Sequence, residues 1–320
     1  MNHRLERFAF IGLLALVTLL NSCSRTEIPN PEPNPILFGA YTRGDINLDL
    51  SAVQDLEQDL DHTLDIVQWF TNFDHTWDPE EVRKAALFGR IPMITWQPTD
   101  HPLDGILSGD DDAYLKEWAR GAKTYGKAIY IRLMPEMNGN WVSWSGNGAK
   151  YIKTWRYIVD IFRDQGATNV KWIWAPNCMD GPRDDPSYFM ESYYPGKNYV
   201  DVIGLSGFNW GNVEKIHIWR SYEDIFLSAY TRLNKISDHP YWIVETASAE
   251  DGIDSQRKAD WIKNMFTSQA FPKVEAVIWF NEDKEHDWRV QSSPSSLNAF
   301  REILDSTDES RSLLATSYLR

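Results

Sequence analysis

Two glutamates that stand directly at the ends of apolar runs are the residues of this sequence best placed to do chemistry. Glu136 lies in IRLMPEMNGNWVSWSG (131–146), and Glu245 lies in YWIVET (241–246). Two carboxyl groups in one site can divide catalytic work, one as general acid or base and the other as nucleophile. A single glutamate such as Glu136 is more commonly a solvated loop residue. Its position relative to the predicted strands therefore decides between that interpretation and a catalytic role.

Short apolar runs, rich in β-branched and aromatic residues, alternate with segments of helical pattern from residue 36 onward. The runs are continuously apolar, as strands buried on both faces are. Eight of them, each followed by a helical segment, predict an α/β protein with a single-domain (β/α)8 TIM barrel. An open doubly wound sheet is the alternative, but no glycine-rich phosphate loop follows an early run. The predicted strands are residues 36–41, 65–70, 91–96, 128–133, 170–175, 200–205, 241–246 and 275–280.

Helix limits follow from end signals. Pro79 with two following glutamates predicts a helix start, and Gly89 predicts its end. The aspartates at 110–112 precede a helix that should end at Gly126. Aspartates can also ligate a metal ion. Here the stabilising effect of negative charge at a helix N-terminus explains their position instead. After the fifth predicted strand we expect only a short helix near 185–192.

Active sites of (β/α)8 barrels lie on the loops that follow the strands. Glu136 and Glu245 follow the fourth and seventh runs, and we expect Arg132 to pair with a carboxylate inside the barrel and to tune Glu245. Carboxylates beside aromatic rings and amides suit glycoside hydrolysis, because apolar sugar faces stack on rings. The tryptophans are also compatible with a core role and the asparagines with turns. The predicted substrate-binding residues are Trp96, Asn138, Trp141, Asn177, Phe208, Trp210, Trp279 and Trp288.

Motifs on these loops resemble glycoside hydrolase family 26. They are Arg132-Leu-Met-Pro-Glu-Met-Asn-Gly-Asn-Trp141, WAPN (174–177), YPGKNYVDVIGLSGFNWG (194–211), VETAS (244–248) and WFNEDKEHDWR (279–289). The resemblance extends over essentially all of residues 36–305. It implies a retaining enzyme with Glu136 as acid/base and Glu245 as nucleophile. It also implies β-1,4-mannan as substrate, with mixed-linkage β-1,3-1,4-glucan and β-1,3-xylan as alternatives.

Three positions depart from the family pattern. Pro135 stands where the family usually has a sugar-contacting histidine, and Ser206 stands where it often has an aspartate. Phe208 replaces a tyrosine whose hydroxyl bonds the nucleophile, so Glu245 should be somewhat more basic. The substitutions leave the two-carboxylate mechanism intact. They keep open a competing class, a surface glycan-binding lipoprotein of weak catalytic activity.

The N-terminus has the pattern of a lipoprotein signal peptide. A basic start and the apolar run FAFIGLLALVTLL precede Leu20-Asn-Ser-Cys23, so we expect residues 1–22 to be removed and Cys23 to carry lipid. An ordinary signal peptide with an incidental cysteine is the alternative. Residues 23–35 are a proline-rich tether. We assign residues 36–308 to the barrel and 309–320 to a C-terminal tail, and place the protein in a bacterial cell envelope, at the outer membrane or the cell surface.

The composition narrows the partners. The net charge of −14 disfavours nucleic acid and suits a neutral glycan, and the 15 tryptophans exceed what a core alone requires. His217 and His286 lack partners at metal-ligand spacing. We therefore expect a monomer that binds a β-glycan, meets the membrane through its lipid anchor, and needs neither metal nor cofactor.

Overall fold

The computed structural model describes residues 35–43, 50–212 and 218–319, which fall within one compact unit, Glu32–Arg320. The predicted signal peptide, Cys23, most of the tether and His217 lie outside the described residues. Among the described helices, none is long and apolar enough to cross a membrane.

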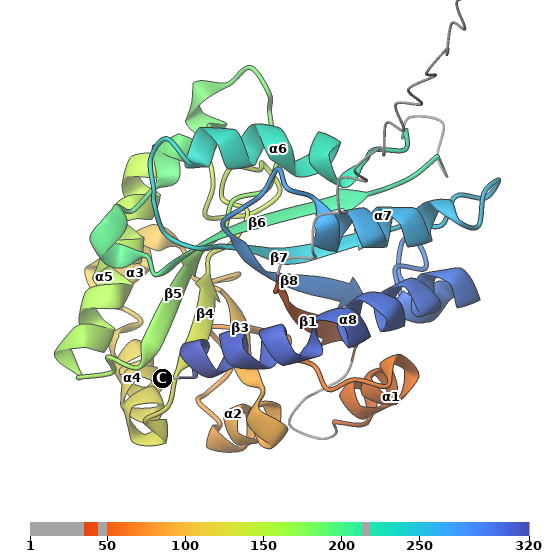
Figure 1. The fold of residues 1–320 in the computed structure, drawn as a ribbon. Coiled ribbons are helices and arrows are strands. Elements are labelled where there is room, and N and C mark those ends of the chain that lie inside the picture. The colour runs from red at the N-terminus through yellow and green to blue at the C-terminus, as the bar shows by residue number, and fades with distance from the viewer. Residues whose placement is uncertain (1–34, 44–49, 213–217, 320) are drawn as a thin grey trace, which may run out of the picture. The chain divides into compact units, whose positions relative to one another are not determined.

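Eight parallel strands close into a barrel in chain order, so the predicted (β/α)8 fold is confirmed. Each predicted run overlaps one strand, and Figure 1 shows the helices outside the strands. The strands are β1 (Leu37–Thr42), β2 (Ile66–Asn72), β3 (Ile91–Gln97), β4 (Ile129–Leu133), β5 (Val170–Trp174), β6 (Val202–Asn209), β7 (Tyr241–Ser248) and β8 (Val274–Asn281).

The helices follow the predicted alternation, with one addition, the short helix α3 before α4. The short helix expected near 185–192 is present as the 3-10 turns η2 and η3, and a third turn, η4, follows them. The α-helices are α1 (Ser51–Leu60), α2 (Pro79–Ala85), α3 (Leu103–Ser108), α4 (Asp112–Tyr125), α5 (Gly148–Asp164), α6 (Tyr222–Leu233), α7 (Arg257–Thr267) and α8 (Pro294–Tyr318). The 3-10 turns are η1 (Leu87–Gly89), η2 (Pro186–Tyr188), η3 (Met190–Tyr193), η4 (Lys197–Tyr199) and η5 (Val290–Ser292).

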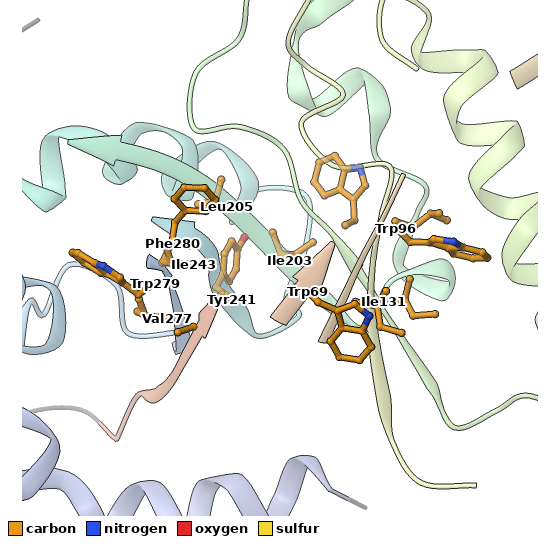
Figure 2. Close-up of a cluster of buried hydrophobic side chains, with 14 of the residues drawn as sticks. Trp69, Trp96, Ile131, Ile203, Leu205, Tyr241, Ile243, Val277, Trp279 and Phe280 are labelled. Carbon is orange, nitrogen blue, oxygen red and sulfur yellow. The ribbon is translucent and has the colours of Figure 1, made fainter. Parts of the chain in front are cut away.

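Buried apolar side chains form two clusters, because successive residues of a strand point to opposite faces. The smaller cluster takes members such as Ile91, Tyr130 and Trp242 from all the strands and fills the barrel. The larger cluster joins the outer strand faces to the helices. Figure 2 shows part of it, with Trp69 and Trp279 among the labelled side chains.

The barrel interior becomes polar toward the carboxyl ends of its strands. The Gln68 amide donates to Thr95 Oγ1 at 2.7 Å, and Thr95 pairs in register with Arg132. Arg132 Nη2 in turn donates to Ser206 Oγ at 3.0 Å. All four side chains are buried, so the apolar filling of the barrel ends in a hydrogen-bonded polar layer beneath the mouth.

Residues 309–318, which the sequence assigned to a C-terminal tail, continue helix α8. Arg311 is buried and donates to Asp65 at 2.7 Å, just before β2. The Tyr318 carbonyl accepts a hydrogen bond from Tyr130 at 3.1 Å, and the Tyr318 ring packs on Trp242. The end of α8 therefore belongs to the barrel unit and packs against the interior cluster.

Candidate active site

The loop after β4 holds Glu136 in a strained backbone. Met134 has φ 42° and Glu136 has φ 58°, a left-handed region that residues with a Cβ rarely occupy. Hydrogen bonds to both neighbouring strands hold this conformation. The Met134 amide donates to the Trp96 carbonyl at 3.0 Å, and the Glu136 amide donates to the Ala175 carbonyl at 2.8 Å. Strained backbone conformations that the surrounding structure holds in place are frequent at functional sites.

Two neutral donors orient the Glu136 carboxylate. Trp141 Nε1 donates to one oxygen at 2.9 Å, and Asn177 Nδ2 donates to the other at 2.9 Å. The Trp141 side chain lies directly over Gly139, where a Cβ would come within 2.3 Å of the indole. The glycine of this motif therefore makes room for the ring. Trp141 remains 54% exposed, so it also presents an indole face to solvent.

Glu245 reaches the mouth through an irregularity in β7. Leu205 pairs with Ile243 and Ser206 pairs with Glu245, so Val244 is an extra residue on β7. Such a β-bulge re-aims the side chain beside it. Val244 joins the interior apolar cluster, while the next residue, Glu245, lines the mouth pocket.

The Glu245 carboxylate is ion-paired with Arg132, as expected for that arginine. Arg132 is fully buried, and 16% of the Glu245 side chain is exposed. Burial raises the pKa of Glu245; the Arg132 charge opposes that shift, and the negative charge of Glu136 adds to it. The direction agrees with the prediction from Phe208, but burial, not the lost tyrosine hydroxyl, is the largest cause.

A pocket of about 440 Å³ brings the two glutamates together with predicted substrate-binding residues. Phe208 and Trp210 form one side of it, and both rings pack on buried Trp288 behind them, with centroids 5.3 and 5.1 Å away. Trp141 and Asn177 also line the pocket. The site thus combines two carboxylates, amide and indole donors, and exposed rings.

Four of the predicted substrate-binding residues are structural. Trp96 and Trp279 are fully buried, and Trp288 is 1% exposed, so none offers a ring face to a ligand. Trp96 stacks on Trp118, and Trp279 donates its N–H to the Trp288 carbonyl at 2.8 Å. Figure 2 labels Trp96 and Trp279 among the buried hydrophobic side chains. These side chains pack between the barrel and the helices. A position near the end of a strand therefore does not by itself place a side chain in the mouth.

Asn138 is the fourth correction, because its side chain is buried and its amide atoms are fully engaged. Its Nδ2 donates to the Asn177 and Met179 carbonyls and to Asp180 Oδ1, at 2.9, 3.3 and 3.0 Å. Its Oδ1 accepts from the Asn177 amide at 2.8 Å. Asn138 therefore braces the loop that carries Asn177 and leaves no polar atom for a ligand.

Cys178, Met179 and Arg220 also line the pocket, and the sequence did not single them out as site residues. Cys178 and Met179 directly follow Asn177, so the loop after the fifth strand carried a positional signal. Arg220 precedes α6 and belongs to no recognised motif. Among the described residues, no group of three or more His, Cys, Asp or Glu is placed to hold a metal ion.

The fold and the site define the class: a (β/α)8 barrel with a carboxylate pair and aromatic walls at the carboxyl ends of its strands. Comparison with known proteins supports glycoside hydrolase family 26 for this chain. The model of the family described as "Glycosyl hydrolase family 26" matches residues 113–238.

Two curated relatives and two solved structures illustrate the similarity. Endoglucanase H of Acetivibrio thermocellus is 39% identical over 266 residues, 79% of this chain and 29% of that protein. A mannan endo-1,4-beta-mannosidase of Bacillus subtilis is 30% identical over 113 residues, 30% of this chain and 29% of its own length. The chain thus matches under a third of each. The GH26 β-mannanase BoMan26A from Bacteroides ovatus has a TM-score of 0.61 at 16% identity, covering 85% of this chain and 89% of that one. The catalytic domain of the Bacillus sp. JAMB-750 GH26 endo-β-1,4-mannanase has a TM-score of 0.62 at 17% identity, covering 85% and 86%.

The assignment of some tryptophans to the core and others to the site can be tested by measuring how their substitution changes the free energy of unfolding. We expect Trp279→Ala to lower the free energy of unfolding by about 3–5 kcal/mol, because it leaves a large cavity. Trp141→Ala should change it by less than about 1 kcal/mol, because the ring is exposed. Urea unfolding followed by circular dichroism measures both. Equal losses of stability in the two variants would contradict the assignment.

Proposed function

We propose that this chain is a retaining β-glycoside hydrolase in which Glu136 is the proton donor and Glu245 the nucleophile. The observation that carries the proposal is that one pocket holds both carboxylates in different environments. Glu245 is largely buried and lies against the positive charge of Arg132, whereas Glu136 accepts from the neutral donors Trp141 and Asn177. Different surroundings are how two carboxyl groups take different roles.

The reaction would proceed in two displacements. Glu136 gives its proton to the glycosidic oxygen as the bond to the anomeric carbon breaks, and a Glu245 oxygen bonds that carbon. The first product leaves with the proton. Glu136, now ionised, takes a proton from water, and the water oxygen attacks the anomeric carbon. The ester to Glu245 breaks, and both carboxyl groups return to their starting states.

Residues around the two glutamates stabilise and orient the carboxyl groups and offer surfaces for sugar binding. Arg132 favours the ionised Glu245 that attacks, and it stays beside that carboxylate when the ester forms. Trp141 and Asn177 hold the Glu136 carboxyl in place through both steps. The exposed ring of Trp141 and the half-buried rings of Phe208 and Trp210 offer faces on which sugar rings can stack.

β-1,4-Mannan is the first proposed substrate, because the mannanases among the relatives and solved structures share this family and fold. A specific observation favours mixed-linkage β-glucan as the second. The similarity to Endoglucanase H covers 79% of the chain, and Pro135 lacks the side-chain donor of the family's sugar-contacting histidine. β-1,3-Xylan is the third, since a β-1,3-xylanase of Alcaligenes sp. is 22% identical over 229 residues.

Loss of either carboxyl group tests the mechanism. Glu136→Ala and Glu245→Ala should each lower kcat at least about a thousandfold, because each removes a group that the reaction requires. Reducing-sugar release from mannan, glucomannan, barley β-glucan and β-1,3-xylan measures activity and selects the substrate. Glu80→Ala, which removes an exposed carboxylate on α2, is the matched control. Normal hydrolysis by the double variant would refute the proposal, and binding without products would favour the glycan-binding alternative.

The pH dependence tests the Arg132–Glu245 pair. Burial raises the pKa of Glu245 and Arg132 lowers it, so Arg132→Gln should raise that pKa further. Because the nucleophile must be ionised, activity should then be lost at a higher pH as the pH falls. The acid limb of kcat/KM against pH measures the shift, and Arg83→Gln, at an exposed arginine, should leave it in place. An acid limb that stays in place or moves to lower pH in Arg132→Gln would contradict the pairing.

We also propose that the mature protein is held in the cell envelope by lipid on Cys23. The lipobox-like Leu20-Asn-Ser-Cys23 after a basic and apolar start supports this, and the proline-rich segment that follows suits a tether. In cells given a labelled fatty acid, the wild-type protein should carry label and sediment with membranes. Cys23→Ala should abolish the label. Labelling that persists in Cys23→Ala would refute the anchor.

A further inference from the structure

A second pocket, of about 750 Å³, adjoins the active-site pocket and shares Cys178, Met179 and Arg220 with it. The loop after β5, as far as η3, forms one side, and α6 from Asp224 to Arg232 forms the other. A chain that leaves the active-site pocket past Met179 and Arg220 therefore enters this second hollow directly. We call it the distal pocket.

The lining of the distal pocket suits a neutral, hydroxyl-rich ligand. Phe189 and Met179 are 37% and 51% exposed and supply apolar surface. Three arginines face three carboxylates, so the formal charges of the lining balance: Arg183, Arg220, Arg232, Asp180, Glu191 and Asp224. Placed polar groups around an apolar surface are typical of ligand pockets, and apolar sugar faces pack on aromatic rings.

The polar groups of the distal pocket are held rigidly. Arg232 forms a two-pronged pair with Glu191, its Nε and Nη2 lying 2.7 and 2.5 Å from the carboxylate oxygens. Its Nη1 lies 2.8 Å from Asp180 Oδ2. These bonds fix the planes of the side chains before any ligand arrives, which limits the entropy lost on binding.

Hydrogen bonds connect Asp180 of the distal pocket to Glu136, the proposed proton donor. Asp180 Oδ1 accepts from Asn138 at 3.0 Å, and Asn138 Oδ1 accepts from the Asn177 amide at 2.8 Å. Asn177 Nδ2 donates to Glu136 at 2.9 Å. The loop that forms the wall between the two pockets is therefore the loop that orients Glu136.

We propose that the distal pocket is a subsite for sugar units of the glycan remote from the bond being cleaved. The inference rests on the proposed function and extends it, because it assigns the enzyme to chains longer than the active-site pocket holds. Binding energy from remote units accelerates the chemical step when it positions the reacting bond. Turnover should therefore rise with chain length as long as the distal pocket is open.

Blocking the distal pocket tests the inference. Ser228 is an exposed α6 residue that lines the pocket, so Ser228→Trp should fill it without disturbing the core. Leu227→Trp is the matched control, because Leu227 is exposed on the same helix and does not line the pocket. Trisaccharides and hexasaccharides of β-1,4-mannan and of mixed-linkage β-glucan are the probes. The hexasaccharide-to-trisaccharide ratio of kcat/KM should fall about tenfold in Ser228→Trp and stay near wild type in Leu227→Trp.

Phe189→Ala provides a second variant, and the same ratio should fall about five- to tenfold as the stacking surface is lost. An unchanged ratio in both Ser228→Trp and Phe189→Ala would overturn the distal subsite while leaving hydrolysis intact. If the wild-type protein cleaves none of the glycans, the proposed function fails instead. Calorimetric hexasaccharide binding then decides the subsite: weaker binding by Ser228→Trp supports it, and equal binding overturns it.

Discussion

A positive charge buried at the top of the barrel is the constraint on which the site depends. Arg132 on β4 is fully buried, and an unpaired guanidinium there would cost several kcal/mol. Its partners come from two other strands, Ser206 on β6 and Glu245 on β7. The register of these strands and the bulge at Val244 bring those partners to it. The carboxylate that satisfies the arginine is the one proposed to attack the substrate.

The second carboxylate is held by a different means. Glu136 lies in a backbone segment with two left-handed residues, Met134 and Glu136 itself, and their amide hydrogen bonds to the Trp96 and Ala175 carbonyls keep that segment in place. Its oxygens meet an indole and an amide, which carry no charge. The same barrel mouth thus presents one carboxyl group against a cation and another among neutral donors. Environment, not residue type, separates their roles.

The tryptophans divide by depth. Trp141 projects from a loop over a glycine and stays exposed, whereas Trp96 and Trp279 fill the space between strands and helices. Trp288 lies between these groups: it is buried, yet Phe208 and Trp210 pack against it. The many tryptophans of the sequence therefore serve two purposes: some line the pocket, and others pack behind that lining. The buried N–H groups of Trp279 and Trp96 donate to the Trp288 carbonyl and to the Tyr114 hydroxyl, at 2.8 and 3.1 Å.

The barrel, its strand positions, and the roles of the two glutamates and Arg132 as candidate site residues could all be predicted from the amino-acid sequence. Continuously apolar runs report burial on both faces, and residues at strand ends must meet at one mouth. Which of the aromatic and amide side chains near these residues face the pocket could not be predicted, because that depends on packing between distant segments. Trp279 and Glu245 both lie near strand ends, but a bulge turns one toward the mouth while helix packing covers the other. The role of Asn138, the inclusion of residues 309–318 in α8, and the distal pocket likewise depend on contacts between segments far apart in the chain.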